Sequence, residues 1–199
     1  MKKLMMIAAL MVATLTASAQ GPFIKPMAGG TLTTFTGTDV DDLKMRFGFV
    51  GGVELGYQFG KHFALTGGAL YTMQGARVSN DYTKYNINFD YINVPIMTAF
   101  YPVEGFGIKA GAQFGFLTRA KWGDNDFKDY VKKTDFSIPV GLSYEFEETS
   151  IDLRYNIGLS NILKERVEGD RSRFYGANID GEIKNCVLML TIGYKIALY

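Results

Sequence analysis

The segment from Phe47 to Met73 alternates between two kinds of residue with a period of two, and this pattern restricts the fold more than any other feature of the chain. On both sides of Gly-Lys-His at 60–62, apolar residues or glycine occupy every second position. Small or polar residues occupy most of the positions between them. Because successive side chains of a strand point to opposite faces, the segment predicts two long antiparallel strands joined by a tight turn.

The same alternation recurs along the chain and predicts eight strands, at residues 23–35, 45–59, 63–76, 89–101, 106–119, 135–146, 151–160 and 187–198. Short connections at 60–62, 101–105 and 147–150 alternate with longer polar loops at 36–44, 77–88, 120–134 and 162–184. This arrangement predicts an all-β, up-and-down antiparallel barrel of eight strands, which closes on itself and leaves no free edge. Pro95 and Pro139 lie inside two of these strands and predict β-bulges.

The first nineteen residues have the composition of a secretory signal peptide. Two lysines precede an apolar run, and Ala-Ser-Ala at 17–19 precedes Gln20. We expect residues 1–19 to be removed, leaving residues 20–199 as one outer-membrane barrel domain; a retained anchor helix is the alternative. Loss of Lys2 and Lys3 would leave 19 basic and 20 acidic residues, from 21 and 20 in the full chain. With no basic surplus, nucleic acid is not expected as a partner.

Alternation alone does not distinguish a membrane barrel from a soluble, lipocalin-like barrel with an apolar cavity. The polar face consists largely of glycine, alanine, serine and glutamine, which suits a narrow interior better than a water-exposed surface. The apolar face concentrates aromatic residues near the strand ends: Tyr57, Phe59, Phe63, Phe100, Phe106, Tyr144 and Phe146 beside the short turns, and Phe47, Phe49, Phe116 and Phe136 toward the loops. Two aromatic girdles around an apolar band are typical of transmembrane barrels, so we expect the apolar face to contact lipid.

Four segments carry a family resemblance: Tyr-Ile-Asn-Val-Pro-Ile-Met-Thr-Ala-Phe-Tyr-Pro at 91–102, and the stretches at 135–146, 152–162 and 190–196. They resemble the PorT-like outer-membrane β-barrel family of Gram-negative bacteria, and the likeness extends over residues 21–199. The resemblance implies an eight-stranded outer-membrane barrel and, for some relatives, a part in secretion or surface assembly. Where the family often has an acid before the apolar-Pro pair, this chain has Asn93.

Charged residues on the polar faces predict a group of ion pairs inside the barrel. Counting inward from the short turns puts three acids and three bases at similar depth: Glu54, Glu145, Asp152, Lys109, Arg154 and Lys195. Pairing Phe146 with Ile151 would set Glu145 opposite Asp152, and these like charges would repel each other. We therefore expect Arg154 or Lys109 to lie between them, and expect Arg154→Ala to cost ~3–5 kcal/mol of stability. Separate solvation of each charge by water is the alternative.

No residue pattern indicates catalysis, a cofactor or a metal site. His62 is the only histidine and lies in a short turn, without a nucleophile or an orienting group beside it in sequence. The acids at 122–129 lack the spacing of a calcium loop. We therefore expect a protein that is not an enzyme.

The long loops are the expected interaction surface, because they carry aromatic residues in charged surroundings. The candidates are Tyr82, Tyr85, Trp122, Phe127, Tyr130, Phe174 and Tyr175. Packing of the loops against each other is the alternative explanation. We expect a monomer in outer-membrane lipid with both termini periplasmic, and a structural or interaction role in surface assembly, secretion or adhesion through other envelope proteins. A narrow passive channel is the second hypothesis, and a lipid-modifying enzyme at the rim is the third.

Overall fold

The computed structural model describes residues 21–37, 43–80, 83–122, 125–126, 128, 131–162 and 183–198. Residues 1–20 lie outside this part of the chain, so the signal peptide stays a prediction. The strands are β1 (Gly21–Gly37), β2 (Leu43–Phe59), β3 (Phe63–Asn80), β4 (Thr83–Val103), β5 (Phe106–Trp122), β6 (Asn125–Asp126), β7 (Thr134–Phe146), β8 (Thr149–Gly158), β9 (Ile183–Tyr194) and β10 (Ile196–Ala197).

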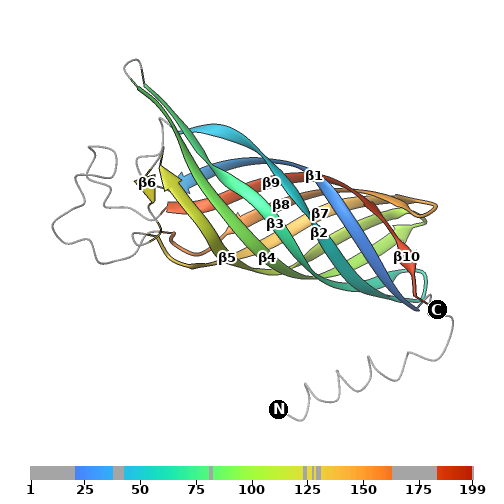
Figure 1. Cartoon of the computed structure of the whole chain (residues 1–199). Coiled ribbons are helices and arrows are strands. Elements are labelled where there is room, and N and C mark those ends of the chain that lie inside the picture. The colour runs from blue at the N-terminus through green and yellow to red at the C-terminus, as the bar shows by residue number, and fades with distance from the viewer. Residues whose placement is uncertain are drawn as a thin grey trace, which may run out of the picture.

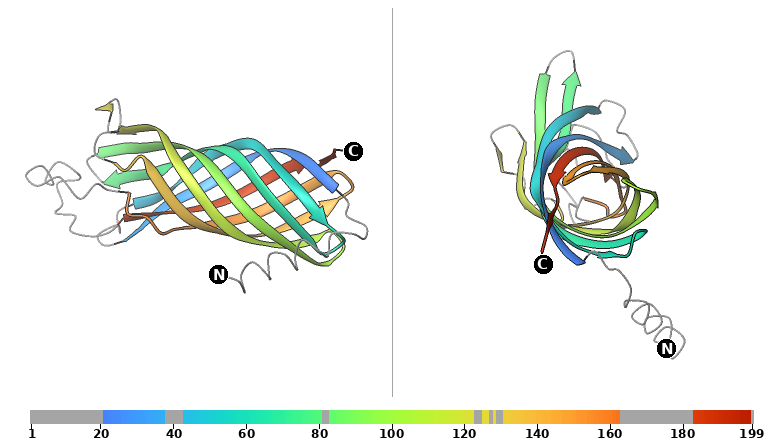
Figure 2. Two further views of the ribbon diagram at one scale, coloured as in Figure 1. Left: turned by 90° about the horizontal axis from the view of Figure 1, so that it is seen from below. Right: turned by 90° about the vertical axis from the view of Figure 1, so that its right-hand side faces the viewer.

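Eight of these strands form a closed antiparallel barrel. Each long strand pairs with the next one along the chain, and β1 pairs with both β2 and β9, so the sheet has no open side (Figure 1). The two-residue strand β10 pairs with β1 beyond the end of β9, and β6 pairs with the end of β5. The strands are steeply tilted around a central axis, as Figure 2 shows. The fold predicted from the alternation is confirmed.

The two ends of the barrel differ. At one end, here called the turn end, β2–β3, β4–β5 and β7–β8 are joined by connections of two or three residues. Gly60 and Gly105 adopt positive φ angles of 63° and 80° in two of them, and Glu147 does so at 53° in the third. Positive φ is the conformation that tight turns require. At the other end, the loop end, the connections are longer except between β3 and β4.

Strand pairing continues beyond the barrel on one side of the loop end. β3 and β4 stay paired as far as Asn80 and Thr83, past the last β4–β5 pair at Ile87 and Trp122. The two strands stand out from the barrel wall in Figure 1. Together with the ends of β2 and β5 and with β6, they form a sheet above the rim, which we call the rim sheet (residues 43–46, 75–80, 83–90, 119–122 and 125–126). The sequence predicted loops for most of these residues.

The apolar face is on the outside, as expected. Large apolar side chains that alternate along each strand are exposed, among them Phe47 at 74% and Leu55 at 56%. Aromatic side chains pack across neighbouring strands at both ends: Phe63 against Phe100 at the turn end and Phe114 against Phe136 at the loop end, each with ring centroids 5.1 Å apart. In the described part of the chain, no helix is long and apolar enough to cross a membrane.

The interior is filled by side chains in successive layers. The ion-paired residues of the interior lie in the half nearer the turn end, while the buried Asp135 lies in the half nearer the loop end. An apolar cluster of Met27, Val50, Leu70, Val187 and Met189 lies among the inward residues of β1, β2, β3 and β9.

A second apolar cluster closes the loop end: Phe35, Phe89, Tyr91, Leu117, Ala120, Val131, Ile162 and Ile183. Val131 and Ile162 enter it from segments outside the long strands. These segments are fixed by backbone bonds from Lys132 N to Ile162 O and from Leu117 N to Lys133 O, both 2.8 Å. An eight-stranded barrel has room for side chains and little else.

The two prolines do not mark bulges, so that prediction is wrong. The register is the same on both sides of Pro95 and of Pro139. Described pairs are only interrupted near them, which agrees with the missing N–H of proline. The register instead shifts between Asp90 and Tyr91, between Phe100 and Val103, and between Met45 and Val50.

Gly111 on β5 gives a direct test of strand packing. A Cβ at this position would fall on the carbonyl oxygen of Ile96 on β4, whereas a Cβ at Gly67 would meet nothing nearer than the Pro95 carbonyl oxygen at 3.7 Å. We expect Gly111→Ala to lower the free energy of unfolding by about 1–3 kcal/mol through overpacking and Gly67→Ala to leave it nearly unchanged. Urea unfolding in lipid vesicles measures both variants. Equal stability of the two would show that β4 and β5 adjust to the added methyl group.

Candidate functional site

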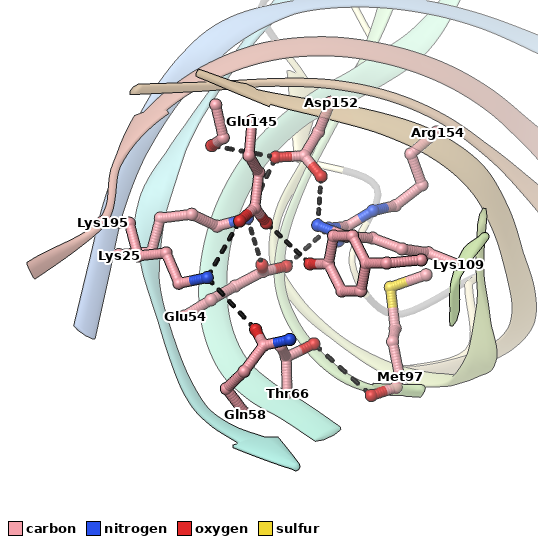
Figure 3. A network of polar contacts seen from close by, with 12 residues as sticks. Lys25, Glu54, Gln58, Thr66, Met97, Lys109, Glu145, Asp152, Arg154 and Lys195 are labelled. Atoms are coloured by element: carbon pink, nitrogen blue, oxygen red, sulfur yellow. Dashed lines mark hydrogen bonds and ion pairs between the residues drawn. The ribbon is translucent and has the colours of Figure 1, made fainter. Parts of the chain in front are cut away.

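The inward faces of four strands bring five charged side chains together in the barrel interior. Lys25 comes from β1, Glu54 from β2, Lys109 from β5, and Asp152 and Arg154 from β8 (Figure 3). All five are almost completely buried, with exposed fractions of 1–3%. We call this group the lumen ion cluster.

Asp152 pairs with two lysines. Its Oδ2 accepts a hydrogen bond from Lys25 Nζ at 3.0 Å, and its Oδ1 accepts one from Lys109 Nζ. The Ser150 hydroxyl also lies 3.3 Å from Oδ2. A buried carboxylate is tolerated when it is paired and hydrogen-bonded in this way.

Glu54 holds the other half of the lumen ion cluster. Its Oε1 accepts a hydrogen bond from Arg154 at 2.5 Å, and its Oε2 lies 3.2 Å from Lys25 Nζ. Lys25 and Glu54 are direct cross-strand partners of β1 and β2. The contacts therefore run in one chain of alternating sign, from Lys109 through Asp152, Lys25 and Glu54 to Arg154, with three cations and two anions.

A second, less buried group lies nearer the turn end. Lys195 Nζ is 2.8 Å from Glu145 Oε2 and 3.2 Å from Gln58 Oε1, and it lies 4.6 Å from the centroid of the Phe23 ring. The Tyr101 hydroxyl donates to Glu145 Oε1 at 2.6 Å. The lysine and glutamate side chains are 19% and 14% exposed, so we call this the turn-end pair.

The structure changes the predicted arrangement in two ways. It places Glu54, Lys109, Asp152 and Arg154 in one cluster and Glu145 with Lys195 in another, and the described ion pair of Glu145 is with Lys195 rather than with Arg154 or Lys109. The predicted pairing of Glu145 with Asp152 is wrong, because the β7–β8 turn has two residues and Glu145 pairs with Ser150 while Asp152 pairs with Ser143.

Lys25 was not among the residues predicted to form ion pairs inside the barrel. The inward face of β1 includes Phe23, Met27 and Phe35, so this strand lacks clear alternation. The signal that would have found Lys25 is the antiparallel pairing of β1 with β2, which are consecutive in the chain, because this pairing sets Lys25 opposite Glu54.

The predicted loop residues fall at or beyond the limits of the described structure. Tyr82, Phe127, Tyr130, Phe174 and Tyr175 lie outside the described residues. Tyr85 and Trp122 lie in strands rather than loops: the backbone of Tyr85 pairs with Val78, and that of Trp122 pairs with Ile87 and Asn125. Their roles stay predictions.

The charge arrangement is that of structural ion pairs. Every carboxylate of the two groups contacts at least one cation. Among the residues that the structure describes, no group of three or more histidine, cysteine, aspartate or glutamate side chains could hold a metal ion. The carboxylates of these two groups therefore serve as partners for lysine and arginine within the barrel.

A closed antiparallel barrel with an apolar exterior and a polar, charged interior is a transmembrane β-barrel. The outer membrane protein beta-barrel domain model matches residues 20–164. The chain belongs to this family, and the family places it in the outer membrane. A comparison with curated protein sequences finds no match.

Solved structures of other outer-membrane barrels share the fold, among them the following two. Ail, the attachment invasion locus protein of Yersinia pestis, is 19% identical over 88% of this chain and 99% of its own, with a TM-score of 0.53. Neisserial surface protein A is 14% identical over 91% of this chain and 99% of its own, with a TM-score of 0.54. In both cases the match extends over nearly the whole length of the solved chain.

Proposed function

We propose that this protein is a non-enzymatic outer-membrane barrel whose loop end binds other envelope or surface components, in surface assembly, secretion or adhesion. The rim sheet is the observation that carries the proposal. The pairing of β3 and β4 up to Asn80 and Thr83 extends an ordered sheet past the barrel wall. A barrel without a binding role outside the membrane would not need strands that extend beyond the barrel wall. The resemblance to PorT-like barrels supports a role in secretion or surface assembly.

We further propose that both termini lie in the periplasm and that the loop end faces outward. Outer-membrane barrels have short periplasmic turns and longer extracellular loops, and the connections of this barrel differ in the same way. Ail, which is named as an attachment protein and was crystallised with a heparin analogue, supports the idea that a barrel of this fold binds other components.

The filled interior argues against the second candidate, a narrow passive channel. The lumen ion cluster and the apolar cluster at the loop end stand one after the other along the axis. We therefore expect no steady open state when the purified barrel is inserted into a planar lipid bilayer, because eight strands leave only enough space for side chains. A porin inserted into the same membrane is the positive control. A large, stable conductance that scales with the amount of inserted barrel would contradict this expectation.

A lipid-modifying rim enzyme, the third candidate, would need a general base near the lipid-facing rim. The only histidine of the chain, His62, lies in the β2–β3 turn at the opposite end. This position supports a binding role over a catalytic one.

The binding role is tested by shortening the longest connection at the loop end. We expect replacement of residues 163–182 by a short Gly-Ser segment to abolish co-purification of specific partners from cross-linked outer membranes. A variant with Lys61→Gln and His62→Gln, at the turn end, should keep them. Heat-modifiable migration on a gel shows that both variants still form the barrel. Partners that are retained after the loop is shortened would overturn the assignment of this loop.

A further inference from the structure

A charged group lies on the outer, lipid-facing side of the barrel, where the surrounding side chains are apolar. The register between β4 and β5 shifts so that Asp90 pairs with Arg119 and Tyr91 pairs with Leu117, which leaves Thr118 as an extra residue. Leu117 and Ala120 are buried, while Thr118 and Arg119 are both exposed, Arg119 at 59%. A β-bulge redirects side chains in this way. The bulge therefore turns Arg119 outward.

Asp90 and Tyr71 hold this arginine in place. Asp90 lies opposite Arg119 on the same outer face, with its Oδ2 3.6 Å from Arg119 Nε. The same oxygen accepts a hydrogen bond from the Tyr71 hydroxyl at 2.8 Å. Asp90 is 1% exposed, because these two side chains cover it. The described contact of the guanidinium is through Nε, and no other described side chain contacts its terminal nitrogens.

Two more cations lie near Arg119: Lys121 on the same strand, and Lys128 in the segment after β6. Lys121 is exposed and lies two residues further along β5, where its cross-strand partner on β6 is Asp126. Lys128 donates from Nζ to the carbonyl oxygen of Thr118 at 2.9 Å, which fixes a further ammonium group next to the bulge. At the loop end of β5, the three cations Arg119, Lys121 and Lys128 thus lie near two acidic residues of the described chain, Asp90 and Asp126.

The position of these cations relative to the apolar band indicates what they contact. Phe114 and Phe116, which belong to the outer aromatic residues of β5, are 48% exposed. Arg119 comes three residues after Phe116, or about 10 Å further along the strand at ~3.3 Å per residue. Charges just beyond an aromatic girdle lie at the depth of lipid headgroups. Arginine and lysine at that depth match the geometry and charge of phosphate groups.

We propose that Arg119 and Lys121, with Lys128 beside them, form a binding site for the phosphate groups of an anionic membrane lipid. Asp90 and Tyr71 orient the arginine. Under the proposed orientation of the barrel this lipid lies in the outer leaflet. The site fixes the depth and rotation of the barrel relative to its lipid neighbours, and so determines how the rim sheet, which begins at the same bulge, is presented above the membrane.

The test measures binding of bisphosphorylated lipid A to the folded chain of residues 20–199 in zwitterionic micelles. Native mass spectrometry counts bound lipid, and Trp122, the only tryptophan of the chain, reports binding by fluorescence. We expect Arg119→Gln and Lys121→Gln each to weaken binding about fivefold, and the double variant about 25-fold, because a cation at a charged membrane surface contributes ~1 kcal/mol. Lys61→Gln, which removes an exposed lysine at the turn end, should leave binding unchanged.

Three further arms identify the ligand and the surface. Dephosphorylated lipid A and inorganic phosphate should both bind far more weakly than bisphosphorylated lipid A, since the site uses the phosphate and the neighbouring apolar band together. Equal binding of dephosphorylated lipid A, or no effect of the double variant, would overturn the proposal. A double variant with unchanged lipid binding and a changed oligomeric state would instead show that the surface is a contact between copies of the chain. A micelle has no inner and outer leaflet, so these results do not depend on which end of the barrel faces outward. Surface labelling of intact cells tests that orientation separately.

Discussion

Replacement of Asp152 by asparagine is expected to lower the free energy of unfolding by about 3–5 kcal/mol, because breaking a buried pair leaves an uncompensated charge in the interior. The substitution keeps the size of the side chain and removes only its charge. Lys25 and Lys109, both buried, would then share the lumen ion cluster with Arg154 and one carboxylate, Glu54. Three cations would face one anion, at a site that water hardly reaches.

Urea unfolding in lipid vesicles measures this effect, with the folded fraction followed by heat-modifiable migration. Glu148→Gln, which removes an exposed acid in the β7–β8 turn, is the control and should change stability by less than ~0.5 kcal/mol. If Asp152→Asn changed stability as little as the control, water would be solvating the charges separately.

A second substitution distinguishes charge imbalance from a packing defect. Lys109 has Asp152 as its described partner, whereas Lys25 also contacts Glu54. We therefore expect Lys109→Met to recover part of the loss in the Asp152→Asn background, since removal of both partners leaves no orphaned charge. A packing defect at Asp152 would not be corrected by a change at Lys109.

The strands themselves were predictable from the sequence because one face of each strand points into the barrel and the other face contacts the apolar interior of the membrane. Under that condition a shift of register by one residue would turn every side chain to the wrong face. A shift by two residues leaves the faces unchanged. This is why the alternation did not distinguish the pairing of Phe146 with Ile151 from the observed pairing with Thr149. The deciding feature is the φ angle of 53° at Glu147, in a residue type that rarely adopts it.

The same reasoning explains which parts of the two ion-pair groups were predictable. Glu54, Lys109 and Arg154 each lie between two outward apolar residues of a regular strand, so their inward direction followed from the alternation alone. Lys25 lies on a strand whose inward face mixes apolar and polar residues. The bulge that turns Arg119 outward depends on the pairing of β4 with β5. It has no counterpart in the sequence of β5, where Leu117, Thr118 and Arg119 follow one another without a glycine or proline.

The position of Lys25 also changes what is expected of Arg154. With three bases against three acids, loss of Arg154 would have left an unpaired carboxylate. In the structure Glu54 keeps Lys25 at 3.2 Å when Arg154 is removed, and the remaining cluster has two cations and two anions. We therefore expect Arg154→Met to cost about 2 kcal/mol, in the range of a single hydrogen bond to a charged group, instead of the ~3–5 kcal/mol of a broken buried pair.

Replacement of Glu54 by glutamine is expected to cost more stability than replacement of Arg154. It would leave Arg154 without its described carboxylate partner, and Lys25, Lys109 and Arg154 would face Asp152 alone. The expected loss is about 3–5 kcal/mol, measured by the same urea unfolding.

Arg154→Met in the Glu54→Gln background should restore part of this loss, so that the double variant is more stable than Glu54→Gln alone. Additive losses in this double-mutant cycle would show that Glu54 and Arg154 do not interact energetically, and the lumen ion cluster would then be a set of separately solvated charges. A positive coupling, together with a smaller cost for the arginine than for the glutamate, would show that the excess positive charge of the cluster sets the order of these effects.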